Sequence, residues 1–495
     1  MLYRLFIKVH RILGTVLSIL FLMWFLSGMV MMYHTYPSLS QQQRMEHAET
    51  AAVAMLPAIN ADTVTSIAFE RVAGRDICIV GTPDGETVID IGTNQAVERF
   101  TAEELMQMAS QWTTATPTLL NILNEIDVWL IGAMPFKEYP IYHYALNDGH
   151  GSELYLSSRT GRALQLTDRT SRFWAWVGAI PHWIYITKLR ATGRQPWTDT
   201  VLWLSGFGIA MTLAGIIVGI RAMILARRRG RCWRGFAICW RGFAIPDASA
   251  LTPYAKPLFR WHHLFGLCFG LFVLTWIFSG FMSLADAPQL LWPTHTGHSA
   301  KDIYAAELHT SRFTLDCNKV LASAKVKRLE LMEMGGRPYY HVWTADNDYL
   351  VDAAAGQPVP CLLTTEQCRQ TVQAAGAHGS RVTATMLTAY DNYYVSQKRP
   401  LPLPICRVKI DDADGSTYYI DPRTGACRYY NHNKRAGKWM YTGLHALNTS
   451  FFASHPLLRL VILWTLLIGG TVVSATGVLM AFKVIKRKTV KKTTT

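Results

Sequence analysis

Four long apolar runs restrict what this chain can fold into. Each has about 20 residues or more and is nearly free of charged side chains, enough for a helix to cross a bilayer core of roughly 30 Å. Apolar residues make up 50% of the 495 positions although the formal net charge is +15, because they are concentrated in these runs. The sequence therefore predicts a membrane protein with four transmembrane helices. The runs are residues 12–33, 201–225, 264–284 and 457–482.

Basic side chains mark the ends of these runs. They precede the first run, fill the segment between the second and third runs, and follow the fourth. Cytoplasmic segments of membrane proteins carry an excess of Lys and Arg, so these three segments are predicted to be cytoplasmic and the two long segments to lie outside. Nucleic acid is not expected as a partner, because the basic residues adjoin membrane ends and belong to no nucleic-acid-binding module. The lipid bilayer is the expected partner of the four runs.

The chain also repeats itself. The pattern His-x3-Gly-x9-Trp-x2-Ser-Gly begins at His10 in the first run and at His262 in the third. Because a helix turns by about 100° per residue, the His, the Trp and both Gly of each copy share one helix face. Such a repeat predicts two halves related by a pseudo-two-fold axis along the membrane normal. Further matched pairs, separated by 261 to 264 residues, are Arg75 and Arg337, Asp90 and Asp352, Asp127 and Asp391, Pro140 and Pro404, His182 and His445, Trp203 and Trp464, and Gly215 and Gly477.

The two long segments between the runs have the pattern of α+β domains. Each contains a helix-start signal, at Thr101 and at Thr364, where acidic or amide side chains follow the Thr. Each also contains short strand-like runs that end in turns. These runs are residues 87–91, 153–156, 349–352 and 417–421.

The expected fold is thus an internally duplicated bundle of four transmembrane helices with two α+β domains outside the membrane. Asp127 and Asp391 recur in these domains and are expected to hold loops by hydrogen bonds. The expected segments are 1–34 (N-terminus and first span), 35–172 (first outer domain), 173–226 (interfacial helix and second span), 227–260 (basic loop), 261–285 (third span), 286–437 (second outer domain), 438–483 (interfacial helix and fourth span) and 484–495 (basic tail).

Four histidines occupy matched positions near the ends of the spans. His10 and His262 begin spans on the cytoplasmic side, whereas His182 and His445 precede spans on the outer side. Facing helices of a bundle commonly hold metal cofactors, so each pair is a candidate clamp for one flat metal cofactor. Two imidazoles leave no open axial position on a haem iron, which favours electron transfer over oxygen activation. The repeated residues expected to lie against such groups are Gly14, Gly266, Trp24 and Trp276.

Three further histidines are rival ligands. His34, His263 and His455 lie near span ends but have no match in the repeat. A single His near a membrane end is more often an interfacial polar residue than a ligand, and this explanation applies most to His182 and His445, which precede their spans by a dozen residues or more. Ionisable groups inside spans are costly and usually functional, and repetition favours ligation for the pair that begins the spans.

Cysteine usage fits an oxidising compartment. One cysteine, Cys78, falls in the first outer segment and five fall in the second. Disulfides from Cys361 to Cys368 and from Cys406 to Cys427 are compatible with the sequence, but connectivity cannot be read from spacing.

Together these motifs resemble the PepSY-associated transmembrane family, over nearly the whole chain. The resemblance includes the four spans and the repeated His-Gly helix starts. It also includes one strand-turn segment and two loop segments. The matching segments are His-Arg-Ile-Leu-Gly at His10, His-His-Leu-Phe-Gly at His262, Pro-His at His182, Leu-His at His445, Tyr-Ile-Asp-Pro-Arg-Thr-Gly ending at Gly425, Asp-Asn-Tyr-Tyr at Asp391 and Arg-Pro-Leu-Pro-Leu-Pro at Arg399.

The resemblance implies PepSY-like periplasmic domains on a bundle that binds haem b, with two groups expected, in a bacterial inner membrane and with both termini in the cytoplasm. Members include ferric-siderophore reductases, so the implied activity is transmembrane electron transfer that reduces periplasmic ferric iron for iron uptake. The chain has no glycine-rich nucleotide fingerprint, so the expected donor is a quinol or a cytoplasmic reductase. Candidate contacts to a ferric chelate or siderophore are Tyr394, Arg399 and Arg407.

Two other classes of function stay open. A non-enzymatic, membrane-anchored PepSY sensor would bind a peptide or regulate a protease, and the purified protein would be colourless. A transporter would use the duplicated bundle for alternating access, but four spans leave little room for a gated path and none is visibly broken at its middle.

Overall fold

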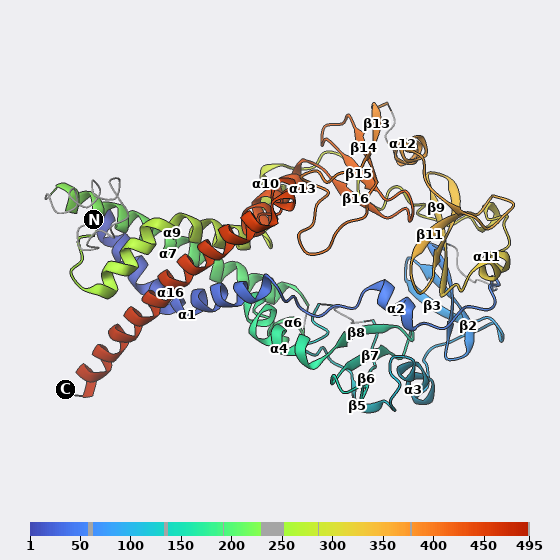
Figure 1. Ribbon diagram of the computed structural model, residues 1–495, viewed down its shortest axis with the longest axis horizontal. Helices are drawn as coiled ribbons and strands as arrows, with labels where there is room; N and C mark the ends of the chain where they lie inside the picture. The colour runs from blue at the N-terminus through green and yellow to red at the C-terminus, as the bar shows by residue number, and fades with distance from the viewer. Residues whose placement is uncertain are drawn as a thin grey trace. The chain divides into compact units, whose positions relative to one another are not determined.

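The chain divides into two compact units in the computed structural model (Figure 1). The helical unit comprises Met1–Tyr36, Phe173–Leu291 and Ala436–Thr495, and the sheet unit comprises Pro37–Arg172 and Trp292–Arg435. Most of the expected basic loop, and the last two residues of the expected basic tail, lie outside the described residues. Those described are 1–57, 63–132, 137–191, 193–228, 252–285, 287–376 and 379–493.

Four helices in the helical unit are long and apolar enough to cross a membrane. Each covers all or nearly all of one predicted apolar run, although α1 and α9 end two residues before their runs do, so the prediction of four candidate spans is confirmed. Every helix extends beyond its run because polar and basic side chains continue it at one or both ends. The four are α1 (Leu2–Met31), α7 (Gln195–Arg228), α9 (Pro257–Met282) and α16 (Pro456–Thr493), whose candidate span ends at Lys486.

The four helices form one bundle, in which α1 and α9 each pack against both α7 and α16. Large apolar side chains from all four helices fill its core, among them Phe21, Phe25 and Ile277. The opposite faces of the helices carry exposed apolar side chains such as Val16, at 70% exposure, and Leu271, at 69%. Exposed apolar surface of this kind is typical of helices that face lipid. The chain is therefore a membrane protein by length and composition of its helices.

Short helices adjoin α7 and α16 in the sequence. Two of them, α5 (Ala179–Trp183) and α14 (Leu444–Ala446), carry His182 and His445. Both end at a residue in the left-handed region, where branched side chains are strained: Ile184 at φ 52° and Leu447 at φ 51°. The remaining short helices here are α4 (Arg169–Val177), α6 (Thr187–Arg190), α10 (Ala287–Leu291), α13 (His432–Lys438), η3 (Trp439–Gly443) and α15 (Ser450–Ser454).

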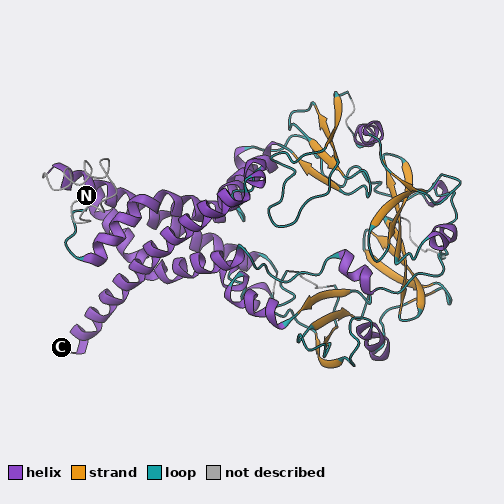
Figure 2. Cartoon of the chain, in the orientation of Figure 1, coloured by secondary structure: helices purple, strands orange, loops and turns teal. Residues whose placement is uncertain are grey.

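All strands of the described residues belong to the sheet unit (Figure 2). Eight of them form one antiparallel sheet, in which β1 pairs with β9 and so joins the two halves of the chain. In β9 the buried Leu329 and Leu331 alternate with Arg328 and Glu330, the period expected of a half-buried strand. In spatial order the strands are β12 (Pro360–Cys361), β11 (Asp348–Asp352), β10 (Arg337–Trp343), β9 (Arg328–Met334), β1 (Ser66–Val72), β2 (Arg75–Thr82), β3 (Gly85–Asp90) and β4 (Gln95–Ala96).

Each half also forms a four-stranded antiparallel sheet, with strands in chain order. The first contains β5 (Thr118–Leu123), β6 (Ile141–Ala145), β7 (Glu153–Ser157) and β8 (Ala163–Thr167). The second contains β13 (Val382–Leu387), β14 (Ile405–Ile410), β15 (Thr417–Ile420) and β16 (Cys427–Tyr430). All four strand-like runs expected from the sequence fall on strands, namely β3, β7, β11 and β15, although Ile91 and Asp421 lie one residue beyond theirs.

Helices accompany these sheets. Thr101 and Thr364 begin α3 (Ala102–Ser110) and α12 (Thr365–Ala374) with complete capping boxes, so both predicted helix starts are confirmed. The sequence predicts two outer domains, 35–172 and 286–437. In the structure, residues 67–70 of β1 pair with residues 328–331 of β9, so one sheet joins Pro37–Arg172 to Trp292–Arg435 in a compact unit. Further helices of this unit are α2 (Gln41–His47), η2 (Thr310–Arg312) and α11 (Cys317–Ser323).

Candidate functional site

His10 and His262 meet inside the bundle, although they come from helices that are not direct neighbours in it. Their ring centroids lie 6.1 Å apart. The His10 Nδ1 lies 3.0 Å from the carbonyl oxygen of Met211 on α7. The His262 Nδ1 lies 3.2 Å from the carbonyl oxygen of Val473 on α16. Each imidazole is thus anchored to the backbone of an adjacent helix.

These contacts fix the tautomer of both rings. A backbone carbonyl only accepts hydrogen bonds, so the Nδ1 atoms of His10 and His262 carry the hydrogens and donate them. The hydroxyl of Thr476, 3.0 Å from the His262 Nδ1, accepts as well, because its own hydrogen is donated to carbonyls of its helix. Nε2 then carries the lone pair of each neutral imidazole. Metal-binding histidines usually show this arrangement, with the non-ligating nitrogen donating to the protein.

A second pair, His182 and His445, has the same ring separation. Their centroids also lie 6.1 Å apart. The His182 Nδ1 lies 3.1 Å from the Ser27 hydroxyl and 3.2 Å from the Trp24 carbonyl, both on α1. The His445 Nδ1 lies 2.9 Å from the Ser279 hydroxyl on α9. The two short helices therefore fix their imidazoles against the ends of two candidate spans.

The serine hydroxyls act as acceptors in these contacts. Ser27 donates its own hydrogen to carbonyls of α1, and Ser279 donates to the Trp276 carbonyl at 2.8 Å. Each serine oxygen is thus left to accept from the histidine Nδ1. The lone pair lies on Nε2 in His182 and His445 too. All four matched histidines share one tautomer, which the sequence alone does not reveal.

The two pairs lie at different depths along the bundle. His10 and Ser27 are 17 residues apart on α1, and His262 and Ser279 are 17 apart on α9. At a rise of 1.5 Å per residue this spacing spans about 25 Å, close to the thickness of a bilayer core. One pair thus lies near each end of the candidate spans.

Aromatic side chains occupy the core between the two levels. The Trp276 ring stacks on Phe25 at 5.6 Å and lies 5.8 Å from the ring of His445. The Trp24 ring stacks on Phe21 at 5.7 Å. Both tryptophans therefore pack against the bundle core near the second pair.

Glycines give the first pair its room. A Cβ added at Gly215 would lie 2.6 Å from the Cε1 of His10, so only glycine allows the ring to approach α7 this closely. At the matched Gly477 the nearest His262 atom would be 3.8 Å away, an ordinary contact. Beside Gly266 an added Cβ would meet nothing within 4 Å, and at Gly14 it would meet only the Met211 sulfur, at 3.8 Å. Space therefore remains beside Gly14 and Gly266.

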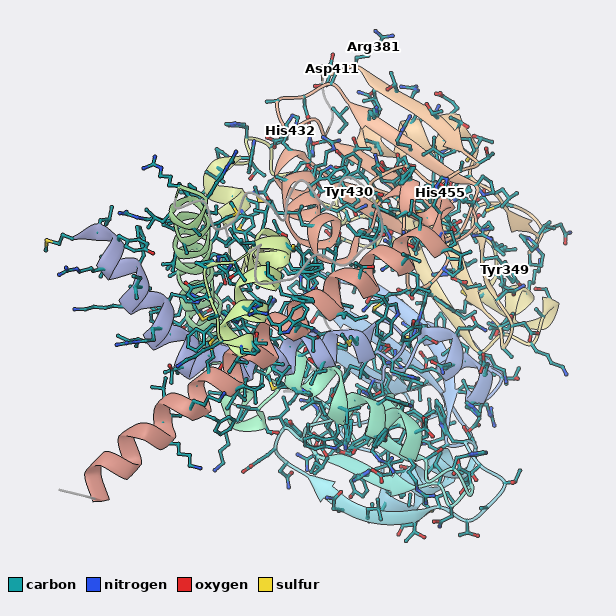
Figure 3. All side chains as sticks on the ribbon, turned by 60° about the vertical axis from the view of Figure 1, so that its left-hand side comes forward. Tyr349, Arg381, Asp411, Tyr430, His432 and His455 are labelled. Atoms are coloured by element: carbon teal, nitrogen blue, oxygen red, sulfur yellow. The ribbon has the colours of Figure 1, made fainter. Side chains whose placement is uncertain are left out.

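The rival histidines are held differently. His34 stacks on Trp174, with centroids 4.2 Å apart and planes within 2°. His263 bonds the Gly219 carbonyl through Nε2, the opposite nitrogen to that used by the matched pairs. His455, labelled in Figure 3, is exposed and bonds the Phe451 carbonyl within its own turn. None of these contacts brings two imidazoles together.

The donor set of both pairs fits bis-histidine ligation of a haem iron. A metal–imidazole bond of about 2.0 Å on each side of one iron places the two ring centroids about 6 Å apart, close to the separation in both pairs. The described residues contain no group of three or more His, Cys, Asp or Glu side chains suited to a metal ion. A pair of imidazoles suits a cofactor that supplies its own equatorial ligands, as a porphyrin does.

The expected substrate contacts differ in their surroundings. Tyr394 is only 3% exposed, and its hydroxyl donates to the Pro402 carbonyl at 2.9 Å, so its position is that of a core residue. Arg407 pairs with Asp391 at 3.2 Å. Of the three, only Arg399 is exposed. Burial and internal bonding of Tyr394 favour a role in packing.

Asp391 organises this region as a loop anchor, as the sequence suggested. Its carboxylate accepts hydrogen bonds from the backbone of Tyr393 and Tyr394 and from the Tyr419 hydroxyl. Burial opposes its ionisation, but these bonds and the contact with Arg407 hold the pKa of the carboxyl below its usual range. In the first half, Asp127 accepts from the backbone of Trp129, and burial raises its pKa. Both aspartates therefore bond to the loop that follows them.

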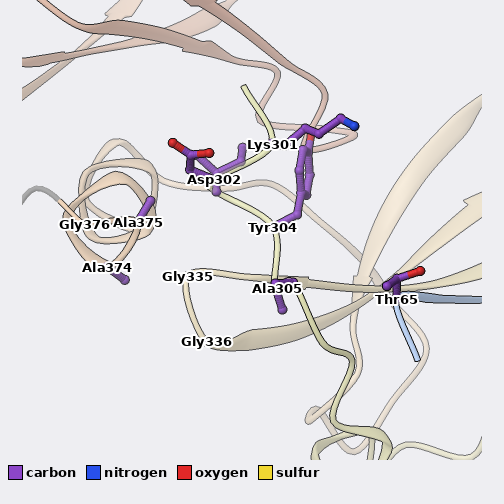
Figure 4. Close-up of a pocket in the computed structure, with 12 residues that line it drawn as sticks. Thr65, Lys301, Asp302, Tyr304, Ala305, Gly335, Gly336, Ala374, Ala375 and Gly376 are labelled. Carbon is purple, nitrogen blue, oxygen red and sulfur yellow. The ribbon is translucent and has the colours of Figure 1, made fainter. Parts of the chain in front are cut away.

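A pocket of about 940 Å³ opens in the sheet unit (Figure 4). It is lined by Thr65, residues 301–306, the β9–β10 turn at Gly335 and Gly336, and the C-terminal end of α12 with the two residues that follow it. Its size suits a small-molecule ligand, since such pockets commonly measure about 300–1,000 Å³. Sequence reasoning missed it, and the Gly335-Gly336 pair was the one local signal of a close turn.

Other residues of the candidate site were also missed, namely the hydrogen-bond partners of the histidines. Ser27 and Ser279 belong to the repeated pattern and were visible as such, but their role was not. The carbonyls of Met211 and Val473 leave no trace in the sequence. The chain matches no protein-family model and no curated protein.

Proposed function

We propose that this chain carries electrons across the bacterial inner membrane through two b-type haems and reduces ferric iron in the periplasm for iron uptake. His10 and His262 would hold one haem, and His182 and His445 the other. When bound, the haems would supply one-electron redox centres near the two faces of the membrane. The protein's own residues hold the four imidazoles in place, set their tautomer and fill the bundle core between the two levels with apolar side chains.

The observation that carries the proposal is the shared geometry of the two pairs. Both have centroids 6.1 Å apart, and both hold Nδ1 in a hydrogen bond with the protein. Four histidines with one tautomer at two depths are not expected from interfacial polar residues, whose partners vary from site to site. A saturated iron with two axial nitrogens favours electron transfer, which supports this class of function over oxygen chemistry.

Charge supports an orientation with both termini in the cytoplasm. Arg4 and Lys8 lie at the start of α1, Arg227 and Arg228 close α7, and Lys486 lies near the end of α16. Such basic ends favour the cytoplasmic side. The first histidine pair would then lie on the side where electrons enter. At the other end, Tyr33 and Trp464 share a hydrogen bond of 2.9 Å, as aromatic residues of a membrane interface do.

Matched contacts support an internal duplication of PepSY-like halves. Met211 and Val473 are 262 residues apart, and each supplies the carbonyl that anchors a histidine. Ile184 and Leu447, 263 apart, take the same left-handed conformation after the second histidines. The sheets repeat in the same order in both halves. A duplicated bundle explains why each ligand pair draws one histidine from each half.

The partners follow from the resemblance and the charge. A quinol or a cytoplasmic reductase would supply the electrons, because the chain has no nucleotide fingerprint of its own. The acceptor would be a ferric chelate such as a siderophore complex, which Arg399, exposed on the sheet unit, could attract by charge. Arg407 is committed to Asp391 and Tyr394 to the core, so both would act by supporting that surface.

The test is the visible spectrum and outward electron transfer of the purified protein. We expect a reduced-minus-oxidised spectrum of b-type haem with two haems per chain. Mixing the reduced protein with a ferric hydroxamate chelate should reoxidise it and yield ferrous iron, trapped by a ferrous-specific dye.

A colourless protein from cells grown with ample haem would refute the proposal and favour the non-enzymatic PepSY sensor. Haem that is present but is not reoxidised by any ferric chelate would retain the ligand assignment and refute the acceptor. Arg399→Ala should weaken reoxidation by a negatively charged chelate. It should leave the spectrum unchanged.

A further inference from the structure

Two thiols touch in the core of the sheet unit. Cys368, on α12, and Cys406, on β14, lie in the same buried cluster, where α12 packs on β14, and their side chains are close enough to interact. Both side chains are fully buried and belong to one apolar cluster. All described cysteines are free thiols in the structure. The packing of α12 on β14 therefore places this pair to react without rebuilding the fold around it.

Regular structure holds both sulfurs in place. The capping box at Thr364 fixes the start of α12, which packs across β13 and β14. In the sheet, Cys406 is paired with Met386 on one side and with Ile420 on the other. Helix and strand are thus both anchored, so the contact between the thiols is set by the packing of α12 on the sheet.

The first half fills the same positions with side chains that cannot react. Leu105 follows Thr101 by four residues, as Cys368 follows Thr364, and Tyr142 follows Pro140 by two, as Cys406 follows its own proline. Leu105 and Tyr142 pack in the corresponding core of the first half. Apolar contact is therefore sufficient to dock this helix, and thiols at both positions add a capacity that packing does not need.

Other partners for these sulfurs fit less well. Cys427 lies on β16, and the whole of β15 separates it from Cys406. Two strand spacings amount to roughly 9.6 Å, beyond the reach of about 7 Å for a disulfide. The Cys406–Cys427 bond considered from the sequence is thus excluded. A structural zinc site needs four ligands, and the described residues hold no suitable group of even three.

We propose that Cys368 and Cys406 form a disulfide that ties α12 to β14 in the mature protein. The proposal rests on the location of the sheet unit outside the cytoplasm, where disulfides persist. Oxidation joins the two sulfurs. A carrier that holds a disulfide takes up the two electrons and the two protons by thiol–disulfide exchange and leaves as a dithiol. Because both sulfurs are buried, exchange precedes docking of α12, and the finished bond is shielded from soluble reductants.

The experiment traps thiols with an alkylating reagent while cells are lysed and the full-length protein is unfolded. Non-reducing digestion and mass spectrometry should recover the peptides of Cys368 and Cys406 joined to each other. Dithiothreitol should leave the bond intact in the folded protein and cleave it in urea. Recovery of both cysteines as alkylated thiols would overturn the proposal. Haem measured in the same preparation keeps this outcome separate from that of the proposed function.

Variants give an independent readout. If the bond exists, Cys368→Ala and Cys406→Ala each remove it, and each should lower the melting temperature by about 10 °C. The double variant should then lower it scarcely more than either single variant does. Losses of the two single variants that add in the double variant would contradict a bond. Cys427→Ala, which removes a neighbouring thiol outside the pair, is the matched control and should not change the trapped cross-link.

Discussion

Gly215→Ala tests whether α7 holds His10 in place. The added Cβ would lie 2.6 Å from Cε1 and 2.7 Å from Nδ1 of His10. An ordinary carbon contact is about 3.5–4.0 Å, so the imidazole must retreat by about 1 Å. Its Nδ1 bond to the Met211 carbonyl, now 3.0 Å, would then exceed hydrogen-bonding distance.

The cost follows from these contacts. Overpacking of this size costs about 1–3 kcal/mol, and loss of the partner of a metal-binding His weakens the metal about 10- to 100-fold. We expect Gly215→Ala to bind one haem normally and to lose the other on dilution, as measured by haem content per chain and by titration. In a helix interior, alanine is more favourable than glycine by about 1 kcal/mol. Haem affinity would therefore fall although the helix itself is stabilised.

Gly477→Ala is the matched control. It receives the same gain in helix propensity, but its Cβ would lie 3.8 Å from the His262 ring and 3.4 Å from the Ser18 side chain. We expect it to keep both haems. Equal haem content and affinity in the two variants would refute the argument that close approach to α7 positions His10.

Three further predictions concern other contacts. Ser279→Ala removes the acceptor of the His445 Nδ1 and should weaken the second haem about tenfold in haem titrations; unchanged affinity would show that the serine does not orient the ring. Asp391 has a lowered pKa in the fold, so its carboxylate contributes stability above its unfolded pKa of about 3.9, and this contribution is lost as pH falls through the folded value. The midpoint of urea unfolding of the sheet unit should therefore fall on acidification below about pH 4 in the wild type and fall less in Asp391→Asn; parallel pH profiles would contradict this. Tyr394→Phe should lower stability by about 1 kcal/mol without altering the concentration of ferric chelate needed for half-maximal reoxidation; an altered concentration would show that the buried ring senses substrate.

Local patterns in the sequence predicted much of the fold. The spans follow from uninterrupted apolar runs, and the starts of α3 and α12 from the side chains at Thr101 and Thr364, because caps and periodicity involve residues a few positions apart. The β1–β9 pairing joins Phe69 to Leu329, far apart in the chain. Nothing local specifies such a partner, so the sequence did not predict that β1 and β9 share one sheet.

The candidate site was predicted in part for the same reason. Repetition singled out His10, His262, His182 and His445, and the structure brings the members of each pair together. Their tautomer depends on carbonyls such as that of Met211, which every residue possesses, so no side chain signals it. Tyr394 was an expected substrate contact because aromatic residues serve both binding and packing, and only its burial in the fold distinguishes the two.

The most direct test of the central claim is the number of haems per chain in a set of histidine variants. We expect two in the wild type, one in His10→Ala, one in His445→Ala and none in the double variant. His263→Ala, whose ring bonds through the opposite nitrogen, should retain two. Two haems in both His10→Ala and His445→Ala, or loss of one in His263→Ala, would contradict the assignment of the two pairs.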